Sequence, residues 1–179
     1  MRNPSRFLSA FFICVVISPL VEAQSLFSLI NQNMSYMKDV AVYKAKENLP
    51  IEDKTAEQAV LDRVQAQAKK NGLDSASVAA FWAAQISVAN NIQTLYQQQL
   101  DLEQDQVHFA QPDMDAEIQT ALDSLQQQII AAFPAFIDRY QSVDKAQRLE
   151  FYQAMSTEYL SEADKKQLYD ALLKVRLAD

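Results

Sequence analysis

Apolar residues recur at steps of three and four along most of the chain, a spacing that is typical of amphipathic helices. The first such stretch covers residues 26–48 and should end before Pro50, because the residue that precedes a proline resists helical geometry. A second stretch begins at Asp53, a favourable N-cap residue, and runs to Asn71. Gly72 follows it, where a glycine suits a left-handed C-cap.

The remaining stretches follow the same pattern. A third helix is predicted from Asp74 or Ser75 to about His108. A fourth is predicted to start at Pro112-Asp113 and to reach Ile137, with Pro134 bending or breaking it. Two shorter helices, about 144–155 and 163–177, complete the chain, and Ser161 with Asp164 approximates a capping box for the last one. The sequence therefore predicts one all-α domain of about six helices.

The N-terminus has a different pattern. Two arginines, Arg2 and Arg6, precede an apolar run over residues 7–17, and small residues around Ala23 resemble a cleavage site. The run is shorter than the roughly 20 residues of a membrane-spanning helix. We expect residues 1–23 to be a cleaved signal peptide, residues 24–179 to form the domain, and the product to be periplasmic or secreted without a membrane anchor. An uncleaved anchor is the alternative. Cys14, the only cysteine, would leave with the signal peptide.

Composition narrows the function further. The 179 residues include 16 basic and 23 acidic side chains, a net charge of −7, which argues against binding to nucleic acid or to an anionic membrane surface. The chain has a single glycine, whereas β-rich folds and phosphate-cradling loops need several. It also lacks a metal-ligand motif and a Ser-His-Asp set in recognisable spacing, so we expect no metal and no cofactor.

Several polar residues nevertheless lie on the apolar sides of the predicted helices, because residues three and four apart share a side. They are Asn33 and Lys44 in the first helix, Asp53 and Glu57 in the second, Gln85 and Gln93 beside Ala89 in the third, and Gln128 in the fourth. Each has a plainer interpretation. Lys44 could extend its ammonium to water, Glu57 could stabilise the first turn of its helix, and the glutamines could lie at stripe edges. His108 fits a surface position, and Trp82 fits the core better than a ligand platform.

Four segments together resemble the secreted gamma-subclass chorismate mutases of the AroQ type. They are LINQNMSYMKDVAVYKAKENLPIED (29–53), EQAVLDRV (57–64), GLDSASVAAFWAAQI (72–86) and NNIQTLY (90–96), and a weaker likeness continues through LDSLQQQI (122–129). The resemblance implies an exported, all-helical homodimer that isomerises chorismate to prephenate by a Claisen rearrangement without a cofactor. It also implies that chorismate is the small-molecule partner.

The resemblance also implies roles for individual residues. Lys44 and Gln93 match the two residues that donate to the ether oxygen broken in the reaction. Glu57 matches the position that binds the substrate hydroxyl, Asp53 an aspartate at the mouth of the second helix, and Ala89 a small residue of the site.

Three matched positions differ from the family, which has arginines where this chain has Asn33, Ala56 and Gln128. Arginine grips carboxylates with two parallel hydrogen bonds, so their replacement should weaken binding of the two substrate carboxylates. Arg63 is nearby in sequence, as are Lys38 and Lys54, but we do not expect these residues to share the stripes above. The sequence leaves open an exported chorismate mutase, active or weakened, a silenced homologue that binds a less charged ligand, and a helical protein-interaction module.

Overall fold

The computed structural model describes residues 25–102, 117–139 and 145–179. The expected signal peptide, His108 and the expected helix start at Pro112-Asp113 lie outside these residues. The described part contains seven helices and no strand beyond one isolated bridge. They are α1 (Leu26–Ser35), α2 (Met37–Lys46), α3 (Lys54–Lys70), α4 (Ser75–Leu102), α5 (Gln119–Arg139), α6 (Lys145–Ala154) and α7 (Glu162–Leu172). The all-α prediction is confirmed.

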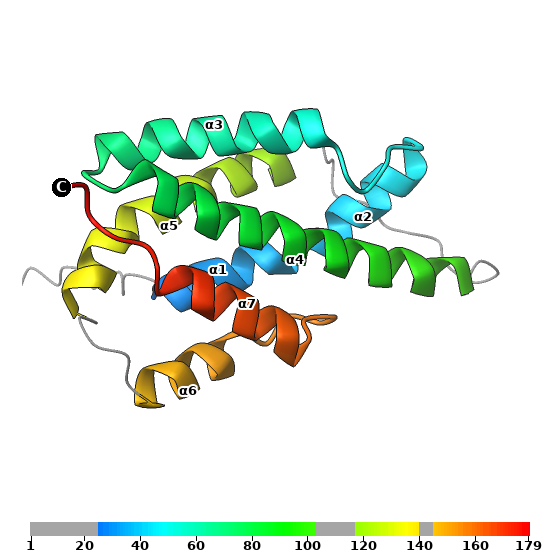
Figure 1. The fold of residues 1–179 in the computed structure, drawn as a ribbon. Coiled ribbons are helices and arrows are strands. Elements are labelled where there is room, and N and C mark those ends of the chain that lie inside the picture. Colours follow the sequence, from blue (N-terminus) through cyan, green and yellow to red (C-terminus); the bar gives the residue numbers. More distant parts are fainter. Residues whose placement is uncertain (1–24, 103–116, 140–144) are drawn as a thin grey trace, which may run out of the picture.

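The longest described helix, α4, runs through the middle of the molecule (Figure 1). Helices α2 and α3 pack on one part of it and α7 on another, while α1 packs chiefly on α5. The buried core joins these layers and includes Ile30, Phe81, Ile129 and Phe133, all fully shielded from solvent. Among the described residues, none of the helices is both long and apolar enough to cross a membrane.

The first predicted helix, 26–48, is interrupted, which the sequence pattern did not indicate. It divides at Tyr36 into α1 and α2. The Ser35 hydroxyl donates to the carbonyl of Gln32 at 2.7 Å, a local bond of the kind that competes with the helical backbone ladder. Helix α2 then ends at Lys46. Asn48 adopts a left-handed φ of 52°, and the Leu49 amide bonds the Lys44 carbonyl at 2.8 Å, an arrangement that is common at helix ends.

The predicted caps of the second and last helices are confirmed. Asp53 caps α3 through Oδ1, which accepts from the amides of Thr55 and Ala56, both at 3.0 Å, as an N-cap carboxylate should. Gly72 has a φ of 68° and follows the end of α3, where a left-handed glycine is usual. Ser161 and Asp164 form a complete capping box at the start of α7.

Helix α5 continues through Pro134, so of the predicted bend or break the break does not occur. One other boundary differs from the prediction. Helix α7 ends at Leu172 and not near Leu177, because the chain beyond it runs back to the turn between α3 and α4, where Leu177 pairs with Leu73 (Figure 1). Arg176 strengthens this junction by a 3.1 Å ion pair with Asp74.

Candidate functional site: a polar cavity beside the central helix

A cavity of about 430 Å³ opens among helices α1 to α5 and the loop between α2 and α3. Its volume falls within the range of about 300–1,000 Å³ that is usual for small-molecule pockets. Seven of the eight site residues predicted from the sequence line this cavity; they are Asn33, Lys44, Asp53, Ala56, Glu57, Ala89 and Gln93. Side chains that helical spacing placed on the apolar sides of four helices therefore meet in one cavity, even though the first predicted helix is divided.

Lys44 extends from α2 and is partly buried in the cavity wall. Its Nζ donates to the Ile51 carbonyl in the α2–α3 loop at 2.5 Å, and since an ammonium has three donors, two remain for a ligand. Burial lowers the pKa of Lys44 below the ordinary lysine value, and the nearby carboxylates of Glu57 and Asp53 oppose that shift. The site thus holds a cation that gains from an anionic partner.

Glu57 and Asp53 bring negative charge to the same side of the cavity. Glu57 Oε1 accepts from Asn90 Nδ2 at 3.0 Å, and Lys54 Nζ lies 3.5 Å from Glu57 Oε2. The Asp53 carboxylate is engaged in capping α3, so its described role is structural and it fixes the helix end at the mouth of the cavity.

Gln93 is 3 % exposed and lines the cavity from α4. Its Nε2 lies 3.8 Å from the sulfur of Met37, and its Oε1 has no hydrogen-bond partner. A thioether sulfur is a weak acceptor, and a buried amide normally satisfies both of its ends. Gln93 therefore retains hydrogen-bonding capacity that a ligand can use.

The prediction that Gln128 faces the site is wrong. Gln128 is exposed on α5, and its Nε2 bonds Ser124 Oγ at 3.0 Å. The residues of α5 that line the cavity are Gln119, Leu122, Asp123 and Gln126. Gln126 is buried and donates to Gln67 Oε1 at 3.0 Å. Sequence spacing selected the wrong line of α5, because this helix also packs on α1 and has apolar residues on more than one side.

Arg63 reverses another expectation, since it lines the cavity although we did not expect it there. Ala56, Val60 and Arg63 follow steps of four and three on α3, so the sequence did contain the signal. The side chain of Arg63 is 53 % exposed, and its nearest carboxylate oxygen, on Asp123, is 4.0 Å away. By contrast, Lys38 pairs with Glu158 at 2.6 Å outside the cavity, as expected.

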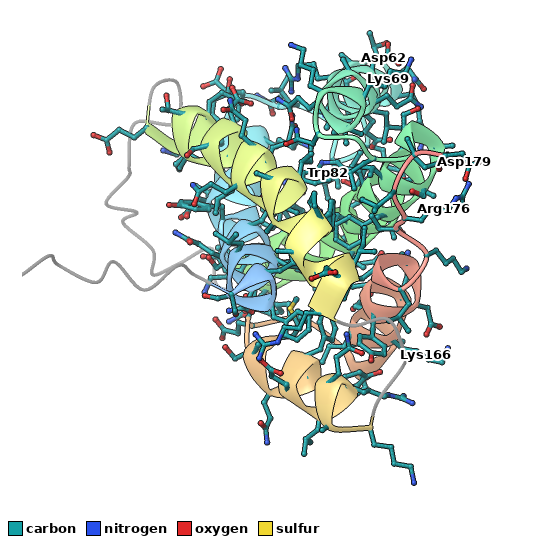
Figure 2. All side chains as sticks on the ribbon, turned by 90° about the vertical axis from the view of Figure 1, so that its left-hand side faces the viewer. Asp62, Lys69, Trp82, Lys166, Arg176 and Asp179 are labelled. Carbon is teal, nitrogen blue, oxygen red and sulfur yellow. The ribbon has the colours of Figure 1, made fainter. Side chains whose placement is uncertain are left out.

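The cavity lining combines charged and apolar side chains. The described lining contains two cationic side chains, Lys44 and Arg63, and three acidic ones, Asp53, Glu57 and Asp123. Apolar residues supply much of the remaining wall. Trp82 belongs both to the core and to this wall, and it lies in the interior of the bundle, whereas Asp62, Lys69 and Lys166 project at its periphery (Figure 2).

Comparison with known proteins identifies relatives over most of the chain. The family model for chorismate mutase type II matches residues 24–94. A monofunctional chorismate mutase of Enterobacter agglomerans is 33 % identical over 178 residues, which cover 95 % of this chain and 94 % of the relative. A secreted chorismate mutase of Yersinia pestis is 42 % identical over 88 residues. That alignment covers 49 % of this chain and 47 % of the Yersinia protein, so it spans about half of each.

The fold agrees with these matches. The crystal structure of the secreted chorismate mutase from Yersinia pestis superposes with a TM-score of 0.74 and 29 % identity, and the match covers 87 % of this chain and 100 % of that chain. Sequence similarity along nearly the whole chain and a shared helical fold lead to one assignment. The chain belongs to the chorismate mutase family.

Proposed function

We propose that this protein converts chorismate to prephenate in the cavity beside α4. The observation that carries the proposal is the meeting of Lys44, Glu57 and Gln93, from three different helices, in one cavity of suitable size. These are the residues that the family resemblance assigns to the reacting ether oxygen and to the substrate hydroxyl. The secreted and monofunctional chorismate mutases among the relatives support the same activity.

The chemistry suits such a cavity. The rearrangement is unimolecular, so the protein must hold a flexible dicarboxylate in a compact conformation, which is catalysis by orientation. It must also stabilise the negative charge that grows on the ether oxygen as the bond breaks. Lys44 supplies a preorganised cation with two donors to spare, and the Gln93 amide lies in the same cavity. Glu57, held by Asn90, accepts a hydrogen bond from the substrate hydroxyl.

Binding of the carboxylates is the weaker part of the site. Asn33 and Ala56 are neutral where the family has arginines, and α5 contributes Gln126 and Asp123 to the cavity without a cation. Arg63, whose ion pair with Asp123 is long and exposed, supplies the available guanidinium at the mouth. We propose that it binds one carboxylate, and that the enzyme works with a higher KM than a site with three arginines would give.

Residues 1–23 are proposed to export the protein, with cleavage after Ala23, which would place it in the periplasm or outside the cell. The name of the secreted Yersinia relative supports this location. The domain is proposed to act as a homodimer, as the resemblance implies.

The decisive experiment follows chorismate depletion and prephenate formation with the purified protein and its Lys44→Ala variant. We expect turnover by the protein and a loss of about 100- to 1,000-fold in the variant, the usual effect of removing a donor to a developing oxyanion. Circular dichroism should show equal helicity in both. An unchanged rate in the variant would refute the role of Lys44, and a folded protein without turnover would refute the activity.

The excess of acidic over basic side chains in the lining favours a second candidate, a silenced homologue that binds a less anionic ligand. This candidate predicts that calorimetric titration with chorismate gives no saturable heat. Saturable binding in the micromolar range would reject it.

A further inference from the structure

A buried pair of amides, Asn33 on α1 and Gln85 on α4, forms part of the cavity wall. Asn33 Nδ2 donates to Gln85 Oε1 at 3.1 Å, and the two residues are 9 % and 1 % exposed. Fifty-two positions apart in the sequence, they meet across two helices, so the bond depends on the tertiary fold. Neither the family motifs nor the mechanism above gives a role to Gln85.

The bond to Asn33 determines which polar atom of the Gln85 amide lacks a partner. Because Oε1 accepts from Asn33, the remaining polar atom is Nε2, and this nitrogen is buried without any hydrogen-bond partner. A buried donor without a partner lowers stability, and native proteins keep few of them. Gln85 thus lines a cavity that is large enough for a small molecule, and it carries an unused donor whose orientation is set by the bond to Asn33.

An N–H donor selects an acceptor on the ligand. An ionised carboxylate is the side group that only accepts, through two oxygens, and it forms stronger hydrogen bonds than a neutral acceptor. Gln85 also lies eight residues before Gln93, which is about 12 Å along the axis of α4. The two amides are therefore suited to contact different parts of one ligand, and Gln85 would contact a group that lies away from the atom bound by Gln93.

We propose that Gln85 Nε2 binds a carboxylate oxygen of the substrate, with Asn33 as the positioning residue that holds the amide in this orientation. The inference rests on the proposed function, because it takes the ligand to be a dicarboxylate. The pair thus provides a neutral carboxylate contact, and the cation Lys44 in the same cavity supplies the charge. A neutral donor attracts an anion over a shorter range than an arginine does, so affinity falls while orientation is kept.

The test compares steady-state kinetics of the purified protein with two variants. Gln85→Leu removes the donor, and we expect KM for chorismate to rise about ten- to one-hundredfold with a smaller change in kcat. Gln85→Glu keeps the shape and the acceptor for Asn33 but replaces the donor by negative charge, so its KM should rise at least as much. That KM should recover as the pH is lowered, because a protonated carboxyl group regains an O–H donor.

Gln147 offers a matched control. It is 3 % exposed, its Oε1 accepts from the Tyr169 hydroxyl at 3.2 Å, and its Nε2 is also without a partner, but it does not line the cavity. Gln147→Leu should leave KM unchanged. Gln85→Leu also removes the acceptor of Asn33 Nδ2, so its melting temperature should fall by a few degrees, and the kinetics are compared at a temperature where every variant is fully folded.

The possible failures are distinct. If the parent protein turns over chorismate and both Gln85 variants keep its KM, the proposed contact is refuted while the activity stands. If KM rises in Gln85→Leu but not in Gln85→Glu, the effect comes from the bond to Asn33, and the direct contact is again refuted. If the folded parent protein neither binds nor converts chorismate, the proposed function fails and this inference fails with it.

Discussion

Buried polar groups lie on two sides of helix α4, Asp164 of α7 on one side and Gln85 and Gln93 of α4 itself on the other, and their hydrogen bonding differs. On the side toward α7, Asn91 Nδ2 donates to Asp164 Oδ1 at 3.0 Å, and Asp164 Oδ2 accepts from the backbone and hydroxyl of Ser161. On the cavity side, Gln85 and Gln93 each keep an unpaired polar atom, although they are at least as deeply buried as Asp164. Burial alone therefore does not distinguish the two sides, whereas incomplete bonding next to a cavity does, and it marks the groups that we propose to bind a ligand.

The largest effect is expected at Lys44, where a substitution should lower activity without lowering stability. Lys44→Met keeps the apolar stem and removes the ammonium, so kcat/KM should fall about 100- to 1,000-fold. The melting temperature should stay equal or rise, because the protein no longer has to bury part of a charge. Activity assays paired with thermal unfolding measure both. A melting temperature lowered by several degrees would mean that Lys44 is mainly structural.

The opposite result is expected for Asp164→Ala on the other side of α4. The substitution removes the capping box and leaves Asn91 without its acceptor, which should lower the free energy of unfolding by about 1.5–3 kcal/mol. Chemical denaturation measures this loss. Activity per folded molecule should not change, so a defect in kcat at a temperature where the variant is fully folded would contradict the contrast between the two sides.

A smaller gain is expected from adding charge at the cavity. Ala56 lines the cavity near the N-terminus of α3 and is itself exposed, so Ala56→Arg has room for a longer side chain. A guanidinium there should lower KM for chorismate about tenfold, somewhat less than a full charged hydrogen bond would give. The same substitution at exposed Ala45, which is not among the lining residues, is the control. Equal KM values for both variants would show that the local position of the charge does not matter.

The mildest test uses pH. Lys44 must be protonated to supply the positive charge that the proposed mechanism needs, and burial holds its pKa below the ordinary value of 10.5, so kcat/KM should decline at a lower pH than for an exposed lysine. Stability should move the other way. A lowered folded-state pKa means that the unfolded chain binds more protons between the two pKa values, so the contribution of Lys44 to stability rises with pH there. Lys44→Met should remove this rise.

Much of the fold could be predicted because its signals are local. The caps at Asp53, Gly72 and Ser161 depend on residues within one turn, and the helical period put Asn33, Glu57 and Gln93 on one cavity. The division at Tyr36 could not be predicted, since no proline or glycine marks it and the hydroxyl bond of Ser35 that accompanies it is one that the sequence permits but does not require.

The site was less predictable where helices have more than one packed side. On α5, the choice between Gln126 and Gln128 depends on how the helix is rotated against α1 and α3, which is a tertiary property. Arg63 was recoverable from its spacing to Ala56 and Val60. No local pattern could predict that Nε2 of Gln85 would be left unpaired, because the orientation of the amide is set by its bond to Asn33 on another helix.

The interruption at Tyr36 also has a consequence for how the molecule opens. Because α1 is anchored on α5 and α6 while α2 is held mainly by α4, the two halves of one amphipathic segment belong to different packing units. Amide hydrogens of α2 should therefore exchange through a sub-global opening that leaves α1 protected. Since Lys44 belongs to α2, each such opening would briefly take the cation away from the cavity, and a bound ligand should slow the exchange of α2 more than that of α1.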